Sequence, residues 1–321
     1  MRLKVLMQIA TMMLIMFLFA MVDIFGEKEI LFPEIAALAL GFWIFEKPPW
    51  QAGWLAVWAS PTLAALTGVL LLRYVFVPTF SLVAIAFILV VLQLKVLRSE
   101  VFPSISAAIL AIMTHTTSWL YPLSVGILMG IIVLGKIVLE RFRGKPVSAE
   151  IPADRIELCK KENHLISQFI YWSKILAGVL IITASALGSN FLFMIAPPLI
   201  VAFVELSRPD QPLRRTPAKA VLLLFLAAFT GVLWFYLVTD VLHGPLWFFS
   251  GLALGTVFVM FHLFHASFPP VAAIALLPVL VPDIHFWKYP LHVLAGSCLF
   301  VFMGVFFFRE VAPEPAPFAE N

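Results

Sequence analysis

The stretch Phe264–Pro282, FHASFPPVAAIALLPVLVP, decides how this chain is organised. It directly follows a long hydrophobic run. Pro269 and Pro270 have no N–H group and cannot lie inside that helix, although both are tolerated in the first turn of a new one. The new helix is too short to cross a bilayer comfortably, since a span needs about 20 apolar residues. The same pattern recurs at Phe102-Pro103, and looser forms occur at Phe32-Pro33 and Ala196-Pro197-Pro198.

The composition is that of a membrane protein. Of 321 residues, 62% are hydrophobic and 12% are charged, and the mean hydropathy is +1.04. Soluble domains are about half apolar and about a quarter charged. The N-terminal run lacks the cleavage pattern of a signal peptide and is interpreted as a first span. Cys159 and Cys298 are expected to stay apart, so neither a disulfide nor a metal cluster is predicted.

Hydropathy predicts an all-α polytopic membrane protein with about twelve helices, eight long and four short and proline-started. The long spans are expected at residues 5–25, 54–76, 78–97, 119–139, 166–187, 218–238, 245–264 and 289–308. The short helices are expected at residues 33–46, 103–116, 197–206 and 269–281. Whether the short helices cross the membrane or re-enter is left open, and crossing is preferred.

Lysine and arginine set the orientation of such a protein. If the N-terminus is inside and every helix crosses, only Lys28, Arg73 and Lys288 lie outside, and all other basic residues lie inside. This asymmetry predicts a multi-pass protein of the cell inner (plasma) membrane with both termini cytoplasmic. Its expected partners are the lipid bilayer and a small-molecule or anion substrate. The net charge of +3 reflects orientation and not nucleic-acid binding, and homo-oligomerisation is left open.

The two halves of the chain repeat each other. Matching positions lie 164 to 168 residues apart, namely Pro33 with Pro197, Phe102 with Phe268 and Tyr121 with Tyr289. We therefore predict two parallel six-helix halves at 1–145 and 166–310, joined by a cytoplasmic linker at 146–165 and followed by a Pro-rich tail at 311–321. Each half holds a long–short–long unit twice, and three crossings per unit make the two units inverted repeats. This plan recurs in transporters, although receptors and scaffolds also arise by duplication.

Two motifs of the second half carry a resemblance to a known family. One runs from His265 through Phe268–Leu277, FPPVAAIALL, with Pro290 and Gly296 downstream. The other is Ala196-Pro197-Pro198 with the loop 209–213, PDQPL, and Pro217. Over about residues 170–308 the chain resembles the HPP family of integral membrane proteins, named for a His-Pro-Pro step. It departs from the family pattern because Phe268, and not histidine, directly precedes Pro-Pro.

The resemblance implies a function as well as a fold. Members of the HPP family have been linked to nitrite transport in plant plastids, so the similarity implies a transporter of small anions. A weaker likeness to the membrane domains of aromatic-acid efflux proteins runs through the loop Arg214-Arg215-Thr216. That likeness implies an acid exporter instead.

The starts of the short helices are the candidate substrate site, because a helix N-terminus presents unpaired N–H groups and about half a positive charge. The predicted substrate-binding residues lie between the halves and are Pro103, Ser104, Ser106, His262, His265, Ser267, Pro269, Pro270, Pro197, Pro198 and Asn190. In the alternative interpretation, the prolines only break a helix and the serines only cap the next one.

Glu34 and His265 are the candidates for proton coupling. Glu34 stands in the first turn of a short helix, where it would need burial to act as a proton carrier; alternatively it only complements the helix dipole. His262 and His265 share a helix face before a break, where histidine can hold a proton or donate to an anion. The alternative places both at the level of the lipid headgroups.

No enzyme signature is present, such as a Gly-rich phosphate loop, His-Glu-x-x-His or Cys-x-x-Cys. We therefore predict that the protein is not an enzyme and that it needs neither a cofactor nor a metal. The favoured hypothesis is a secondary transporter of a small solute, with a small anion such as nitrite preferred. The alternatives are an exporter of aromatic or lipid-linked acids and a non-transporting membrane scaffold or subunit. An acidic outer mouth at Asp23, Glu27 and Glu29 argues against anion entry from outside.

Overall fold

The computed structural model describes residues 2–45, 48–142, 163–189, 191–208, 211–281 and 286–308. Over these ranges the protein is entirely helical, with twelve α-helices and no strand. Eight helices are long and apolar enough to span a membrane, as the sequence predicts. The predicted tail 311–321, residues 146–162 of the predicted linker and Asn190 lie outside the described residues.

The long helices agree with the predicted spans to within a few residues. The largest differences are three residues: α1 and α7 start earlier than expected, α7 taking in the end of the predicted linker, and α6 ends later. The eight helices are α1 Arg2–Phe25, α3 Trp54–Tyr74, α4 Thr79–Val96, α6 Leu120–Phe142, α7 Asn163–Ser189, α9 Pro217–Tyr236, α10 Leu246–Leu263 and α12 Tyr289–Phe307.

The four short helices start at or next to proline, as predicted. They are α2 Glu34–Ala39, α5 Pro103–Met113, α8 Pro197–Leu206 and α11 Pro270–Leu276. Two of them end sooner than expected as α-helices and change pitch: α2 continues as a π-helical turn over Leu40–Ile44 (η2), and α11 as a 3-10 turn over Leu277–Leu280 (η8). Pro278 explains the second change, because its missing N–H removes an α-helical hydrogen bond.

The break between α10 and α11 is made by the backbone before the prolines are reached. His265 takes a left-handed conformation with φ of 45°, and the Ala266 N–H donates to the Phe261 carbonyl at 3.3 Å. Arg98 ends α4 in the same way, with φ of 49°. Such stops satisfy the last carbonyls of a helix, which lipid cannot do. Pro269 and Pro270 therefore start α11 and are not the sole cause of the break.

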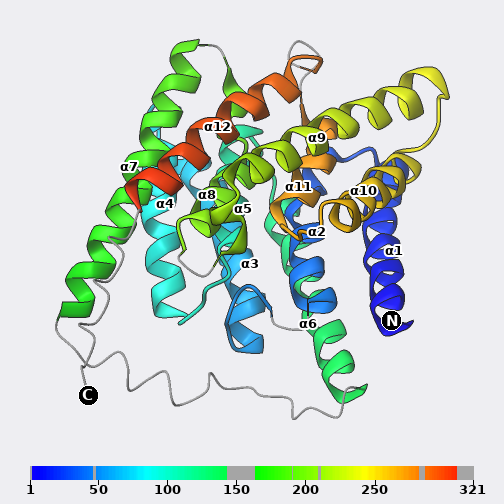
Figure 1. The fold of residues 1–321 in the computed structure, drawn as a ribbon, viewed down its shortest axis with the longest axis horizontal. Helices are drawn as coiled ribbons and strands as arrows, with labels where there is room; N and C mark the ends of the chain where they lie inside the picture. The colour runs from blue at the N-terminus through cyan, green and yellow to red at the C-terminus, as the bar shows by residue number, and fades with distance from the viewer. Residues whose placement is uncertain are drawn as a thin grey trace, which may run out of the picture.

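The short helices form the centre of the protein. Figure 1 shows α2, α5, α8 and α11 in the middle of the ribbon, between α4 and α7 at one end and α1 and α10 at the other. Within this centre, α2 packs against α5, α5 against α8, α8 against α11 and α11 against α2. We call this closed set of contacts the ring. Every residue of α2, α8 and α11 is buried, and so is α5 as far as Ile112.

Glycine lets the long helices approach the ring closely. A Cβ atom on Gly68 of α3 would lie 2.5 Å from the Ala108 carbonyl oxygen on α5. A Cβ atom on Gly231 of α9 would lie 2.4 Å from the Ala275 carbonyl oxygen on α11. Both distances are far inside van der Waals contact, and the obstructing atom is backbone. The two long helices can hold their short neighbours at this distance only with glycine at these positions.

We therefore expect Gly231→Ala to destabilise the folded protein by about 1–3 kcal/mol, the usual cost of overpacking a close contact. Thermal unfolding of the purified protein in detergent measures the effect. Gly255→Ala on α10 is the control, since no atom lies within 4 Å of its added methyl group. Equal melting temperatures for the two variants would contradict the close approach of α9 to α11.

Candidate functional site

The ring has two ends, and the predicted helix starts are divided between them. We call the end with the turns at Arg98 and His265 the first face, because α5 and α11 start there. At the other end, the second face, the chain enters α2 and α8, and α5 and α11 end. The four helix N-termini thus do not surround one point. Two short helices start on each face.

A cavity of about 560 Å³ opens on the second face. Side chains before α2 and α8 and at the ends of α5 and α11 surround it. We call it the Lys28 vestibule, and it is lined by Lys28, Glu29, Leu110, Met113, Thr114, His115, Thr116, Leu192, Phe193, Pro197, Leu277, Val279, Leu280 and Val281. Of the predicted site residues, only Pro197 lies in its wall. Its polar groups, among them one lysine, one histidine and two threonines, were not selected from the sequence.

A second cavity, of about 410 Å³, lies on the first face and contains three predicted residues. His262, His265 and Ser267 meet there with Gln8 of α1, and the two histidine rings are 6.2 Å apart between centroids. We call this the Gln8 pocket, and its remaining lining residues are Val5, Leu40, Ile44, Phe45, Phe258, Phe261 and Ala266. The histidines are exposed at the rim and do not reach the centre of the ring.

The centre of the ring holds a buried polar pair. The Ser106 hydroxyl on α5 donates a hydrogen bond to the Glu34 carboxyl on α2. Glu34 is 1% exposed and Ser106 is fully buried. The second carboxyl oxygen of Glu34 has no hydrogen-bond partner. Both residues were predicted site residues, and the structure brings them together across a contact between two short helices.

The other ring serines and prolines do not act as the capping alternative requires. Neither α5 nor α11 receives a side-chain cap. Ser104 is fully buried and its hydroxyl has no hydrogen-bond partner. Pro103, Pro198, Pro269 and Pro270 are buried in the ring and form the starts of its helices. The serines of α5 therefore place polar atoms inside the ring and do not cap its helix.

Two tyrosines hold the ring from the long helices. The Tyr121 hydroxyl donates to the Ala107 carbonyl of α5 at 2.8 Å, and the Tyr289 hydroxyl donates to the Ile274 carbonyl of α11 at 2.9 Å. Both side chains are buried, and each half of the chain supplies one of these bonds to a short helix.

Glu205 is a second buried acid in the ring, and it is not among the predicted site residues. It lies in the last turn of α8, 2% exposed, and neither carboxyl oxygen makes a hydrogen bond of normal geometry. Its polar neighbours are the Trp50 indole and the Arg208 guanidinium. A charged residue within the apolar segment of a membrane protein is rare and usually functional, and that signal could have identified Glu205 from sequence.

Arg208 connects three loops of the first face. Its guanidinium pairs with Glu100 at 3.8 Å and donates to the Pro49 carbonyl at 3.1 Å. It also lies over the Phe102 ring at 5.7 Å. The loops before α3, before α5 and after α8 are thereby held together beside α5 and α8.

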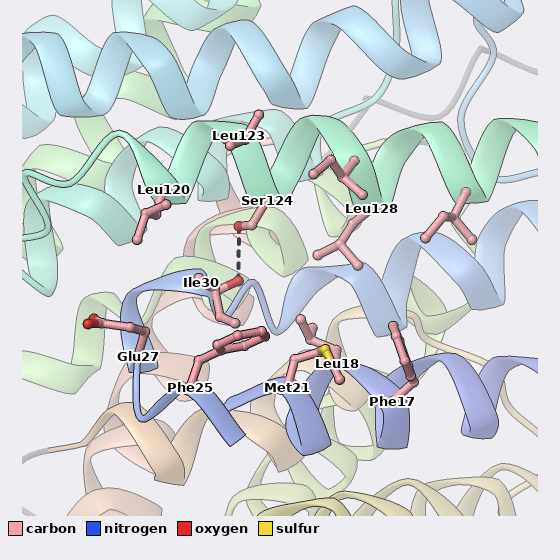
Figure 2. A pocket seen from close by; sticks show the side chains of 12 residues that line it. Phe17, Leu18, Met21, Phe25, Glu27, Ile30, Leu120, Leu123, Ser124 and Leu128 are labelled. Carbon is pink, nitrogen blue, oxygen red and sulfur yellow. Dashed lines mark hydrogen bonds between the residues drawn. The ribbon is translucent and has the colours of Figure 1, made fainter. Parts of the chain in front are cut away.

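A groove of about 630 Å³ between α1 and α6 is unlike these two cavities (Figure 2). Its walls are almost entirely apolar, and the Ser124 hydroxyl donates to the Ile30 carbonyl. Phe17 and Leu123 remain more than half exposed beside it. None of its lining residues belongs to the four short helices of the ring.

The three acidic residues predicted to form an outer mouth, Asp23, Glu27 and Glu29, lie in different surroundings. Asp23 accepts hydrogen bonds from the Leu246 and Trp247 N–H groups at 3.0 and 3.2 Å, and so caps α10. Glu27 lines the groove of Figure 2, and only Glu29 lines the Lys28 vestibule. A single described carboxylate therefore faces the vestibule, beside Lys28, and the vestibule is less acidic than the sequence suggested.

Eight spans and a ring of short helices define a polytopic α-helical membrane protein. Residues 161–315 match the family model described as HPP, transmembrane region. This part of the chain, which holds α7 through α12, belongs to the HPP transmembrane family. The resemblance noted from the Pro-Pro motifs is thereby confirmed over the second half. The comparisons with curated proteins and with solved structures gave no match.

The Glu34–Ser106 pair gives a test of the site geometry. Ser106→Ala should destabilise the protein by about 1–3 kcal/mol, because it leaves a buried carboxyl without its donor. The matched control is Ser60→Ala, which removes an equally buried hydroxyl that donates only to Ala56 within α3. Thermal unfolding of both variants in the same detergent makes the comparison. Equal losses would mean that the hydrogen bond across the ring has no special weight.

Proposed function

We propose that the protein is a secondary transporter that carries a small anion together with a proton, and that Glu34 carries the proton. Nitrite is the first candidate anion because the HPP resemblance implies it. The observation that carries the proposal is the buried Glu34–Ser106 pair at a contact between two short helices of the ring. Ionisable groups inside a membrane domain are costly and mark ion or proton pathways.

The position of Glu34 between two cavities supports this function. Leu110, in the wall of the Lys28 vestibule, is one turn beyond Ser106 on α5. Leu40 and Ile44, in the wall of the Gln8 pocket, follow Glu34 along α2 and η2. The acid therefore lies where α2, which reaches the Gln8 pocket, packs against α5, which reaches the Lys28 vestibule. In this conformation the route between the cavities is closed by the buried side chains of the ring.

Electrostatics explains why anion and proton would move together. An anion about 4 Å from an ionised carboxylate meets a repulsion of about 4 kcal/mol at an effective dielectric constant of about 20. That penalty disappears when the carboxyl is protonated, and a protonated carboxyl can also donate a hydrogen bond to the anion. A proton on Glu34 thus admits the anion, and its release expels the anion. For a monovalent anion the cycle moves no net charge.

The proposed transport mechanism also uses the similarity between the two halves of the chain. Long and short helices follow in the same order in α1–α6 and α7–α12. Left-handed stops at Arg98 and His265, tyrosine bonds to α5 and α11, and glycine contacts to α5 and α11 recur in both halves. We propose two parallel halves, each of two inverted units, because transporters commonly alternate access by moving such units. With the basic residues as counted, the first face is cytoplasmic.

Two rivals remain for the same fold. An exporter of aromatic or lipid-linked acids is favoured by the apolar groove of Figure 2, which could hold a longer hydrophobic substrate. A scaffold is favoured by the close packing of the ring. Buried polar groups argue against the scaffold, since Glu34, Ser104 and Glu205 lie where aliphatic side chains would pack at lower cost.

We expect Glu34→Gln to uncouple the movement of the anion from the movement of the proton. The amide cannot release a proton, so accumulation of nitrite driven by a pH gradient across proteoliposomes should fall to the level of protein-free liposomes. Exchange of labelled for unlabelled nitrite should continue, because glutamine resembles the protonated acid. Wild-type accumulation should respond to the pH gradient and be unchanged by a membrane potential.

Glu27→Gln is the control for this experiment. It removes a carboxylate from an exposed loop and should leave accumulation and exchange as in the wild type. Protein-free liposomes measure the background diffusion of nitrous acid. Undiminished gradient-driven accumulation in Glu34→Gln would remove Glu34 from the coupling. Absence of flux in the wild type, with binding only of aromatic acids, would shift the function to the exporter.

A further inference from the structure

The two halves of the protein differ at one matching place on the first face. Gln8 of α1 and Trp172 of α7 are 164 residues apart, the same separation as Pro33 and Pro197. Helix α1 packs against α10, and α7 packs against α4. Gln8 and Trp172 thus occupy corresponding positions beside corresponding helices, and their surroundings can be compared directly.

On the α7 side this place is filled. The Trp172 ring packs against Phe102 with centroids 5.9 Å apart and against Phe87 with centroids 6.2 Å apart. Arg208 lies over the Phe102 ring at 5.7 Å and pairs with Glu100. Aromatic rings and an ion pair therefore close the first face next to the contact between α5 and α8.

On the α1 side the corresponding place is open and polar. Gln8 is much smaller than tryptophan, and the Gln8 pocket of about 410 Å³ lies beside it. His265 stands at the left-handed stop where the first half has Arg98. In the register that pairs Arg98 with His265, 167 residues apart, Ser267 corresponds to Glu100, so a hydroxyl replaces the carboxylate that pairs with Arg208. The pocket borders η2 and the entry to α11, next to the contact between α2 and α11.

We propose that the Gln8 pocket is the loading site for a small anion on the first face, and that entry to the ring is one-sided. This inference rests on the proposed function and adds to it the place and chemistry of recognition. An anion would bind in the pocket and pass along the contact between α2 and α11 toward Glu34. The matching route beside α5 and α8 stays closed by Trp172 and Arg208.

The donors of the pocket fit such a ligand. The Gln8 amide, the Ser267 hydroxyl and the two imidazoles can all donate hydrogen bonds. No acidic side chain is among its lining residues in the described part of the chain. Its volume exceeds that of an ion with several waters, since each water takes about 30 Å³. A lipid phosphate has the same chemistry as a free oxyanion, so the experiment must separate these two sources.

Filling the pocket tests the loading site. Gln8→Trp places in α1 the side chain that closes the other half, and Ser267→Trp fills the pocket from the opposite wall. Each should reduce nitrite exchange in proteoliposomes at least about tenfold, because an exit or entry route is blocked. Ile9→Trp is the matched control, one residue along α1 at a position 52% exposed, and should transport as the wild type does. All variants are compared at equal amounts of folded protein by size-exclusion chromatography.

Removing the donors tests recognition separately from access. The double variant His262→Ala/His265→Ala should raise the nitrite concentration for half-maximal exchange about tenfold and leave the maximal rate nearly unchanged. The same assays are run in vesicles of phosphatidylcholine alone and with phosphatidylglycerol added. If Gln8→Trp and Ser267→Trp both keep wild-type nitrite flux and lose binding of phosphatidylglycerol, the proposal is overturned in favour of a lipid site. Wild-type levels of flux and of lipid binding in every variant would overturn it outright.

The experiments distinguish failure of the loading site from failure of the proposed function. If the wild type carries no anion, the proposed function fails and the variants have nothing to change. If the wild type transports nitrite and Gln8→Trp does so equally well, transport stands and the loading site falls.

Discussion

Every backbone polar group inside a bilayer must find its partner within the protein, because lipid offers none. Four short helices inside such a fold create helix ends that need partners. The protein meets this need by gathering α2, α5, α8 and α11 into a ring behind eight long helices. Left-handed stops at Arg98 and His265 satisfy carbonyls where α4 and α10 end, and Tyr121 and Tyr289 bond to carbonyls of the ring.

A ring built for this purpose could have been wholly aliphatic. Most of it is, and the alanines of α5 and α11 allow Gly68 and Gly231 to approach within contact of the backbone. Against that background, Glu34 and Glu205 stand out as buried acids with oxygens that lack a full set of hydrogen bonds. Burying a carboxyl without such bonds costs free energy. The proposed proton transfer would give Glu34 a function that offsets this cost.

The loading site proposed above depends on a difference between the two halves on the first face. The ring contacts recur in both halves, whereas the first face is closed by Trp172, Phe102 and Arg208 on one side and open at Gln8 on the other. A transporter with identical halves would offer two equal routes. Here a tryptophan in one half and a glutamine at the matching position leave one polar cavity.

The sequence by itself determined the order of long and short helices and the approximate lengths of the long ones, because long apolar runs and proline-started segments report local chemistry. The span positions, the four short helices and the HPP resemblance of the second half follow from residues close together in the chain. Only the tertiary structure decided which polar groups meet. It joined Glu34 to Ser106 across 72 residues, moved His262 and His265 to a pocket at the rim, and brought Glu205 beside Trp50. Such pairings depend on how helices far apart in sequence pack, and no local pattern encodes that packing.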